Sequence, residues 1–314
     1  MITQENVKSN TKVVGFFSVG VMLMFEVKHL IGNTFYYDAF TNVGIYRLGE
    51  NEAVLIDSCD HKRMVKGLDK ELDAMGLRVS LVINTHCHVD HICGNRYFQD
   101  KYGCKILSTR LEQGFIYKPD LEPDFYNVAL GGNKSNNPFY GIEPSEAEII
   151  AADNIPEGFE IIDLPGHGFE MVGVRTPDDV LFLADSVLSE LTWESYKLPF
   201  FYSVNKATET LEKIKDMRAK LFVPSHNAPV EDIRPLAEYN IEKLKEKKEL
   251  IYTLCDNRSF EELFCEVMEK EELAIKAPKY CMYAVMVRNF LQALIEDDKI
   301  YCELENNRMI YHKK

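Results

Sequence analysis

The sequence lacks three features that would place it in large classes of protein. It has eight cysteines but no two in the CxxC spacing, in a chain of 314 residues. A chain of this size seldom depends on a disulfide framework, so we expect reduced thiols and a cytoplasmic protein. An excess of positive charge is also absent, because the net charge is −14. Such a field repels polyanions, which argues against a nucleic-acid or anionic-membrane partner.

The third absence is a long apolar run near the N-terminus. Val13–Phe25 is apolar, but a helix that spans a bilayer needs about twenty apolar residues. Lys8 and Lys12 precede this run as in a signal peptide, yet no small-x-small cleavage site follows. We therefore expect residues 1–24 to be an N-terminal extension without stable membrane insertion, with Met24 as a candidate natural start. A membrane anchor is the alternative.

The chain instead carries a dense group of metal-binding side chains. An apolar run, Val79–Ile83, reads as a short buried strand, and His86, His88, Asp90 and His91 follow it in the pattern His-x-His-x-Asp-His. Three imidazoles and a carboxylate within six positions suit borderline transition metals, zinc above all. The alternative is a solvated loop that happens to be rich in histidine.

This stretch resembles the signature of the metallo-β-lactamase fold superfamily. That family takes further metal ligands from later loops in the order His, Asp, His. Downstream, the matching residues each follow a short apolar run: His167 after Phe159–Leu164, Asp185 after Val180–Ala184, and His226 after Leu221–Val223.

The resemblance implies a complete ligand set. His86, His88 and His167 would hold the first metal; Asp90, His91 and His226 would hold the second; and Asp185 would bridge both. Two zinc ions per chain are expected, with manganese or iron possible because His/Asp sets accept all three.

The resemblance also implies two supporting roles for carboxylates. Asp90 would be the catalytic residue that carries a proton to the leaving group. Asp57, at the end of the strand-like segment Ala53–Ile56, would hold the loop of the His-x-His-x-Asp-His pattern by hydrogen bonds. We call this loop, residues 84–94, the metal loop. A helix N-cap before the helix expected over His61–Met75 is the alternative for Asp57.

The implied function is a binuclear metal-dependent hydrolase, whose bridging hydroxide attacks an ester, thioester or lactone of a small molecule. This is the glyoxalase II-like or lactonase-like branch of the family, although we find no basic C-terminal motif of the kind that grips glutathione. His88 stands where diiron relatives often carry Glu, and Asp185 stands where the best-known zinc β-lactamases carry Cys. The alternatives are a mononuclear iron persulfide dioxygenase and a phosphodiesterase or ribonuclease of the same fold.

Strands and helices alternate along the first 250 residues, which predicts an α/β fold, a four-layer αβ/βα sandwich over residues 25–250. Residues 118–145 lack periodicity, and we interpret them as a loop. The resemblance implies that a loop at this point lines the substrate entrance. Lys197 and Trp193 are candidates for the substrate mouth, although a tryptophan such as Trp193 is more often a core residue. Packing within the loop is the commoner role for any single side chain here, but six side chains could line a pocket in or beside it: Tyr117, Phe125, Tyr126, Lys134, Phe139 and Tyr140.

Residues 251–314 read as a small C-terminal winged-helix-like domain. Ser259 and Glu262 form a capping box at the start of a helix that runs to about Glu271. A second helix is expected over 279–296, followed by a hairpin of 299–304 with 308–312. Acidic residues outnumber basic ones here, so we expect a structural or dimerising role, with a possible homodimer, in place of nucleic-acid binding.

Overall fold

The computed structural model describes residues 25–127 and 140–314. The extension predicted at residues 1–24 and the predicted pocket residues Lys134 and Phe139 lie outside these ranges, as does the side chain of Tyr126. Within the described residues the first sheet has seven strands in chain order. They are β1 (Glu26–Ile31), β2 (Thr34–Asp38), β3 (Val43–Leu48), β4 (Glu52–Ile56), β5 (Arg78–Ile83), β6 (Lys105–Ser108) and β7 (Glu148–Ile149).

Two helices cover the outer face of this sheet. They are α1 (Lys62–Ala74) and α3 (Asn95–Tyr102). Leu68 and Leu72 of α1, one turn apart, and Phe98 of α3 form one buried cluster with strand residues such as Val82 and Ile106. The i, i+4 spacing of the apolar residues thus gives α1 one face for the sheet, as its sequence predicts.

The second sheet has the order β11-β10-β9-β8. Its strands are β8 (Glu160–Asp163), β9 (Val172–Arg175), β10 (Val180–Ala184) and β11 (Leu221–Pro224). One face packs on the first sheet, where Phe182 and Val223 meet Ile56 and Ile83 in a second buried cluster. The sequence predicted β8, β10 and β11 but missed β9, and it missed β2 and β7 in the first sheet.

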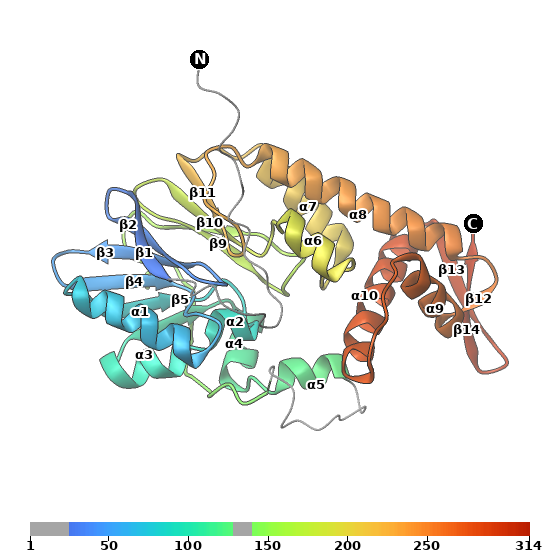
Figure 1. The fold of residues 1–314 in the computed structure, drawn as a ribbon, viewed down its shortest axis with the longest axis horizontal. Helices are drawn as coiled ribbons and strands as arrows, with labels where there is room; N and C mark the ends of the chain where they lie inside the picture. The colour runs from blue at the N-terminus through green and yellow to red at the C-terminus, as the bar shows by residue number, and fades with distance from the viewer. Residues whose placement is uncertain (1–24, 128–139) are drawn as a thin grey trace, which may run out of the picture.

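Helices α6 (Glu190–Tyr196), α7 (Val204–Lys215) and α8 (Arg234–Leu254) cover the other face of the second sheet. Leu181 and Leu183 of β10 are buried in one cluster with Trp193 of α6 and Leu211 of α7. The order of layers is therefore helix, sheet, sheet, helix, as Figure 1 shows. The predicted four-layer αβ/βα sandwich is confirmed.

The strands that precede the predicted ligands end at a common edge of the sandwich. β5 runs parallel to β4 and β6, and β10 runs parallel to β11. β9 is antiparallel to both β8 and β10, so β8 and β10 share a direction. The loops that follow β5, β8, β10 and β11 can therefore bring their side chains together.

The predicted loop over 118–145 is wrong in its first part. After α4 (Arg110–Tyr117), a short helix, α5 (Leu121–Asn127), lies in this segment. A helix of seven residues has little stability of its own, and its sequence shows no clear periodicity. α5 packs against α10 (Ala277–Glu296), which lies far away in the sequence (Figure 1). The contact that stabilises it could not be read from local pattern.

The C-terminal elements follow the predicted order. β12 (Arg258–Ser259), which the sequence did not reveal, precedes α9 (Phe260–Lys270), and α10 leads into the hairpin of β13 (Ile300–Glu305) and β14 (Arg308–Lys313). The capping box of Ser259 and Glu262 is confirmed. Asn306 and Asn307 form the hairpin turn with positive φ values of 48° and 64°, which suits asparagine. The winged-helix assignment stays a prediction.

The C-terminal elements share a core with the sandwich. Residue 250 lies inside α8, which continues into the C-terminal part of the chain (Figure 1). Leu244 and Ile251 of α8 belong to the same buried cluster as Leu211 of α7 and Phe290 of α10. The division into 25–250 and 251–314 stays a prediction. In the described ranges, none of the helices is both long enough and apolar enough to cross a bilayer.

Candidate metal centre

All seven predicted ligand residues lie together at the edge where the strands end. Their metal-binding atoms form two groups, and within each group the atoms lie within 4.8 Å of one another. Asp185 belongs to both groups. The first group is His86, His88, His167 and Asp185, and the second is Asp90, His91, Asp185 and His226. The helix α2 (Val89–Ile92) holds two members of the second group.

Two irregular backbone positions aim the later ligands. The pairing of β10 with β11 shifts register between Phe182 and Ala184, and Ala184 has a positive φ of 51°. This bend comes directly before Asp185. Gly166, directly before His167, has a φ of 130°, and a Cβ there would lie 2.3 Å from the Ala207 nitrogen of α7. Glycine is therefore required for the loop to approach α7 so closely.

Most of the histidine rings are held by a partner on the side away from the centre. The Nδ1 atom of His91 lies 2.8 Å from Asp57 Oδ2. The same carboxylate accepts hydrogen bonds at 2.8 Å from the backbone N–H and the hydroxyl of Thr85. Asp57 thus holds the metal loop as predicted, while the helix N-cap is His61. Nδ1 of His86 faces the Thr85 hydroxyl, that of His167 the Phe200 carbonyl and that of His226 the Phe40 carbonyl.

The atoms that face the centre include buried groups without hydrogen-bond partners. Among the described residues, three such atoms are His86 Nε2, His91 Nε2 and Asp185 Oδ1. Leaving such atoms unpaired costs about 1–3 kcal/mol each, so a site that keeps three of them is built for a ligand. A divalent cation in each ligand group would satisfy the unpaired atoms of that group, and the imidazole and carboxylate donors suit zinc, manganese or iron. The residues therefore fit a metal.

The first group is electrostatically prepared as neutral donors. Burial, with the nearby His91 and His88, holds the pKa of His86 well below its usual range. Burial lowers the pKa of His88 to about 4, and burial with His88 lowers that of His167 to about 3. These rings therefore keep free lone pairs throughout the neutral range, as metal ligands must.

The second group is more strongly charged. Burial would lower the pKa of His91, but Asp90, Asp57 and Asp185 outweigh it and raise that pKa well above its usual range. Burial likewise opposes the rise at His226, which Asp185 and Asp90 produce. The same histidines overcome burial and lower the pKa values of Asp90 and Asp185. The raised pKa values leave His91 and His226 protonated at neutral pH, beside the ionised Asp90 and Asp185.

The two groups should therefore differ in the pH dependence of zinc affinity. A raised histidine pKa means that zinc must displace a proton from His91 and His226 at neutral pH, so the affinity of the second group falls as pH falls. We expect about tenfold per pH unit for each displaced proton between pH 8 and 6. The first group should change little. Competition with a chromophoric chelator measures both affinities.

His61→Ala is the matched control, because His61 is exposed and belongs to neither group. It should leave both pH profiles unchanged. Equal pH dependence of the two zinc affinities in the parent protein would contradict the electrostatic difference between the groups.

Two buried glutamates beside the centre were missed by the sequence analysis. Glu112 on α4 accepts hydrogen bonds from the backbone N–H of Cys87 at 3.0 Å and of Glu170 at 2.9 Å. It thereby joins the metal loop to the loop that carries His167. Glu122 on α5 has Oε1 3.6 Å from His88 Nε2. Burial, with the charges of Asp90 and Glu112, raises the pKa of Glu122 well above its usual range. In the sequence each is a single Glu, and Glu122 lies in the segment interpreted as a loop, so neither gave a signal of this role.

A tyrosine from α6 also lies within electrostatic reach of the centre. Burial, together with the charge of Asp90, the neighbouring Tyr283 and the charge of Asp185, raises the pKa of Tyr196. The hydroxyl of Tyr283, on α10, donates to the Tyr196 carbonyl at 3.1 Å. The C-terminal helix therefore reaches back to the rim of the centre.

Phe200 contacts two of the predicted ligands, and a second group of aromatic side chains surrounds Phe169, two positions after His167. The Phe200 ring lies 5.6 Å from the His88 ring, and Phe169 stacks on Phe115 at 5.0 Å. Tyr202 and Phe125 approach Phe169 at 4.4 and 5.8 Å. We call these five residues the aromatic wall.

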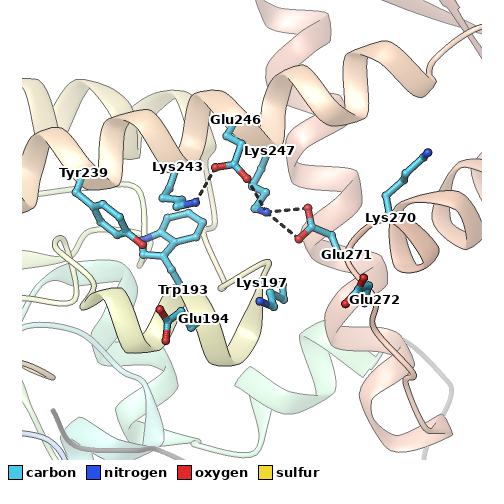
Figure 2. Close-up of a pocket in the computed structure, with 10 residues that line it drawn as sticks. All are labelled: Trp193, Glu194, Lys197, Tyr239, Lys243, Glu246, Lys247, Lys270, Glu271 and Glu272. Carbon is cyan, nitrogen blue, oxygen red and sulfur yellow. Dashed lines mark hydrogen bonds and ion pairs between the residues drawn. The ribbon is translucent and has the colours of Figure 1, made fainter.

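The structure places the predicted pocket residues in different surroundings. Phe125 belongs to the aromatic wall and is 51% exposed. Tyr117 is 66% exposed, and Tyr140 donates to Asp124 at 2.7 Å. Trp193 is buried and its indole N–H donates to Asn240. Together with Lys197 it lines a polar pocket between α6, α8 and the end of α9, shown in Figure 2. The alternative that Trp193 is a core residue is confirmed, while the place of Lys197 at the substrate mouth stays a prediction.

The cysteines of the metal loop belong to neither ligand group. Cys87 is buried with Ile92 and Ile116, and burial raises the pKa of its thiol well above the usual range. Burial, with the charge of Asp60, raises the pKa of Cys93 to about 11. Both thiols are therefore protonated at neutral pH, and none of the eight cysteines of the chain forms a disulfide.

Known proteins with similar sequences include hydrolases. A probable metallo-hydrolase of Methanocaldococcus jannaschii is 29% identical over 113 residues, covering 34% of this chain and 50% of that protein. A hydroxyacylglutathione hydrolase of Hyphomonas neptunium is 25% identical over 165 residues, covering 49% and 54%. The chain thus spans about half the length of these curated relatives.

Solved structures and a family profile extend the similarity to most of the chain. A metallo-beta-lactamase family protein of Thermus thermophilus superposes with a TM-score of 0.66 at 15% identity, covering 87% of this chain and 94% of that one. A beta-lactamase domain protein of Burkholderia ambifaria gives 0.67 at 16%, covering 92% and 93%. The profile of the metallo-beta-lactamase superfamily matches residues 36–226, which include every predicted ligand. This chain therefore belongs to the metallo-beta-lactamase superfamily.

Proposed function

We propose that the protein is a binuclear metal-dependent hydrolase that cleaves an ester, thioester or lactone of a small molecule. The observation that carries the proposal is the pair of ligand groups that share Asp185. A single metal would need only one of them. Buried atoms without hydrogen-bond partners occur in both groups, which supports two cations in place of one.

Two divalent cations would lower the pKa of a shared water and polarise the scissile carbonyl. Around them, the chain's own residues hold and move protons. Asp90 Oδ2 accepts a hydrogen bond from the Thr41 hydroxyl at 3.0 Å and lies 3.3 Å from His226 Nε2. Its side chain is 32% exposed, unlike the buried Asp185. Because its pKa is lowered, Asp90 is ionised, so it could accept the proton that the attacking water releases and pass that proton to the leaving group.

Three observations support a small carbonyl substrate. The net charge of −14 opposes polyanionic substrates. Hydroxyacylglutathione hydrolases, among the relatives, carry a thioester activity in their name. The aromatic wall offers apolar contact for an acyl or alkyl group next to His88 and His167. We place the protein in the cytoplasm as part of the proposal, because its eight free thiols suit a reducing compartment.

The test is one assay panel on the zinc-loaded protein. It contains a glutathione thioester, a simple acyl thioester, a homoserine lactone, a phosphodiester and a β-lactam. We expect turnover of a thioester or lactone that a chelator abolishes and zinc restores. Turnover of the phosphodiester alone, or dioxygen uptake with a persulfide by iron-loaded protein, would replace this proposal with one of its alternatives.

If the aromatic wall binds the acyl group, kcat/KM should rise with acyl chain length. Burying one methylene contributes about 0.8 kcal/mol, or about fourfold per methylene. Phe169→Ala should flatten this dependence, because Phe169 is the centre of the wall. A chain-length series of thioesters measures both slopes.

Tyr301→Ala is the matched control, since Tyr301 is an exposed aromatic residue on the C-terminal hairpin. It should keep the parent slope. An unchanged slope in Phe169→Ala would show that the acyl group binds elsewhere.

A further inference from the structure

The histidines of the centre differ in which nitrogen faces inward. For His86, His91, His167 and His226, Nδ1 meets a hydroxyl, carboxylate or carbonyl of the chain. His88 is turned the other way: its Nδ1 lies 2.9 Å from His167 Nε2, inside the centre. Its Nε2 therefore points outward, and Glu122 Oε1 lies 3.6 Å from it.

This reversal places a requirement on the chain. An imidazole that donates its Nδ1 lone pair to a cation must carry its proton on Nε2. The His88 side chain is only 13% exposed. Its Nε2–H group therefore needs an acceptor within the protein. The carboxylate of Glu122 lies just beyond ordinary hydrogen-bond distance on this side.

Among the described residues, the contact with His88 is the one that accounts for a polar side chain at Glu122. Its side chain is 5% exposed, and Oε2 is buried without a hydrogen-bond partner among the described residues. A buried carboxyl oxygen without a hydrogen-bond partner costs about 1–3 kcal/mol, and apolar residues would pack α5 against α10 without this cost. The carboxylate therefore does not serve merely to anchor the helix.

We propose that Glu122 is a positioning residue, which accepts a hydrogen bond from His88 Nε2–H and so fixes the tautomer and ring orientation that present Nδ1 to the first metal. This inference rests on the proposed metal centre. Histidine ligands commonly donate their second N–H to a carboxylate, and removing that partner typically lowers metal affinity by about 10–100-fold. In this chain the carboxylate comes from α5, which α10 supports.

The first test compares Glu122→Leu with Glu122→Gln by zinc titration against a chromophoric chelator. Leucine keeps the bulk but removes the acceptor, so the affinity of the first group should fall by about 10–100-fold. Glutamine keeps an oxygen acceptor and should recover most of it. Asp69→Asn is the matched control, because Asp69 is another buried carboxylate, which lies in a separate ion cluster with Lys101. It should leave both affinities unchanged.

The second test reads the proton itself. In zinc-loaded protein labelled with ¹⁵N-histidine, the protected imidazole N–H signals should lose one member in Glu122→Leu and none in Glu122→Gln. Parent affinity for both ions in Glu122→Leu, or a loss in Glu122→Gln as large as that in Glu122→Leu, would overturn the inference. Failure of the parent protein to bind zinc would instead overturn the proposed metal centre.

Discussion

Replacing Asp185 with asparagine is expected to lower kcat/KM of the zinc-loaded protein by about 10³-fold. Asp185 Oδ1 lies 3.4 Å from His91 Nε2, while Oδ2 lies 3.2 Å from His226 Nε2 and 3.4 Å from His167 Nε2. Each oxygen thus faces histidines of the ligand groups. Asparagine is neutral and replaces one oxygen by a donor, so it cannot serve both groups. Stabilisation of about 4 kcal/mol in the transition state accounts for the expected loss.

Metal content separates this explanation from a misfolded variant. Asp185→Asn should bind fewer zinc ions per chain, by elemental analysis, with an unchanged circular dichroism spectrum. Asp153→Asn is the matched control, because Asp153 is exposed and lies in neither group; it should keep full activity and metal. Retention of both properties in Asp185→Asn would remove the basis of the proposed function.

Glu271→Leu is expected to lower the free energy of unfolding by about 3 kcal/mol. Both oxygens of Glu271, just after α9, accept hydrogen bonds from Lys247 Nζ of α8 at 2.7 Å, as Figure 2 shows. The two side chains are only 8% and 7% exposed. Without Glu271, the Lys247 ammonium keeps Glu246, at 3.2 Å, as its remaining charged partner. Urea unfolding followed by circular dichroism measures the change.

The double variant Lys247→Met/Glu271→Leu tests the cause. Replacing both charges by apolar side chains of similar size removes the uncompensated charge, so stability should return close to that of the parent. Lys245→Met is the surface control, because its pair with Glu242 is exposed and 3.8 Å long; it should change stability by less than about 0.5 kcal/mol. A double variant as unstable as Glu271→Leu would show that packing, not charge, is responsible.

Much of the sandwich and of the candidate centre could be predicted because the signals are local. Val79–Ile83 and the histidines after it are neighbours in the chain, and β5 ends where the apolar run ends. The same holds for Val180–Ala184 before Asp185. The α1 helix follows from apolar residues at i, i+4. These patterns depend on residues a few positions apart, which a sequence displays directly.

The elements that were missed depend on distant contacts. β9 has four residues and gains its hydrogen bonds from β8 and β10. α5 was interpreted as loop because its support, α10, follows about 150 residues later.

The sequence by itself determined which residues are available as ligands, their order and the strands that carry them. Only the tertiary structure decided which nitrogen of each ring faces the centre, and that Glu122 lies beside the outer nitrogen of His88. Ring orientation depends on the partner of the outer nitrogen. For His167 and His226 those partners lie 33 and 186 positions away. The sequence pattern does not reveal such a contact, because only folding brings the ring and its partner together.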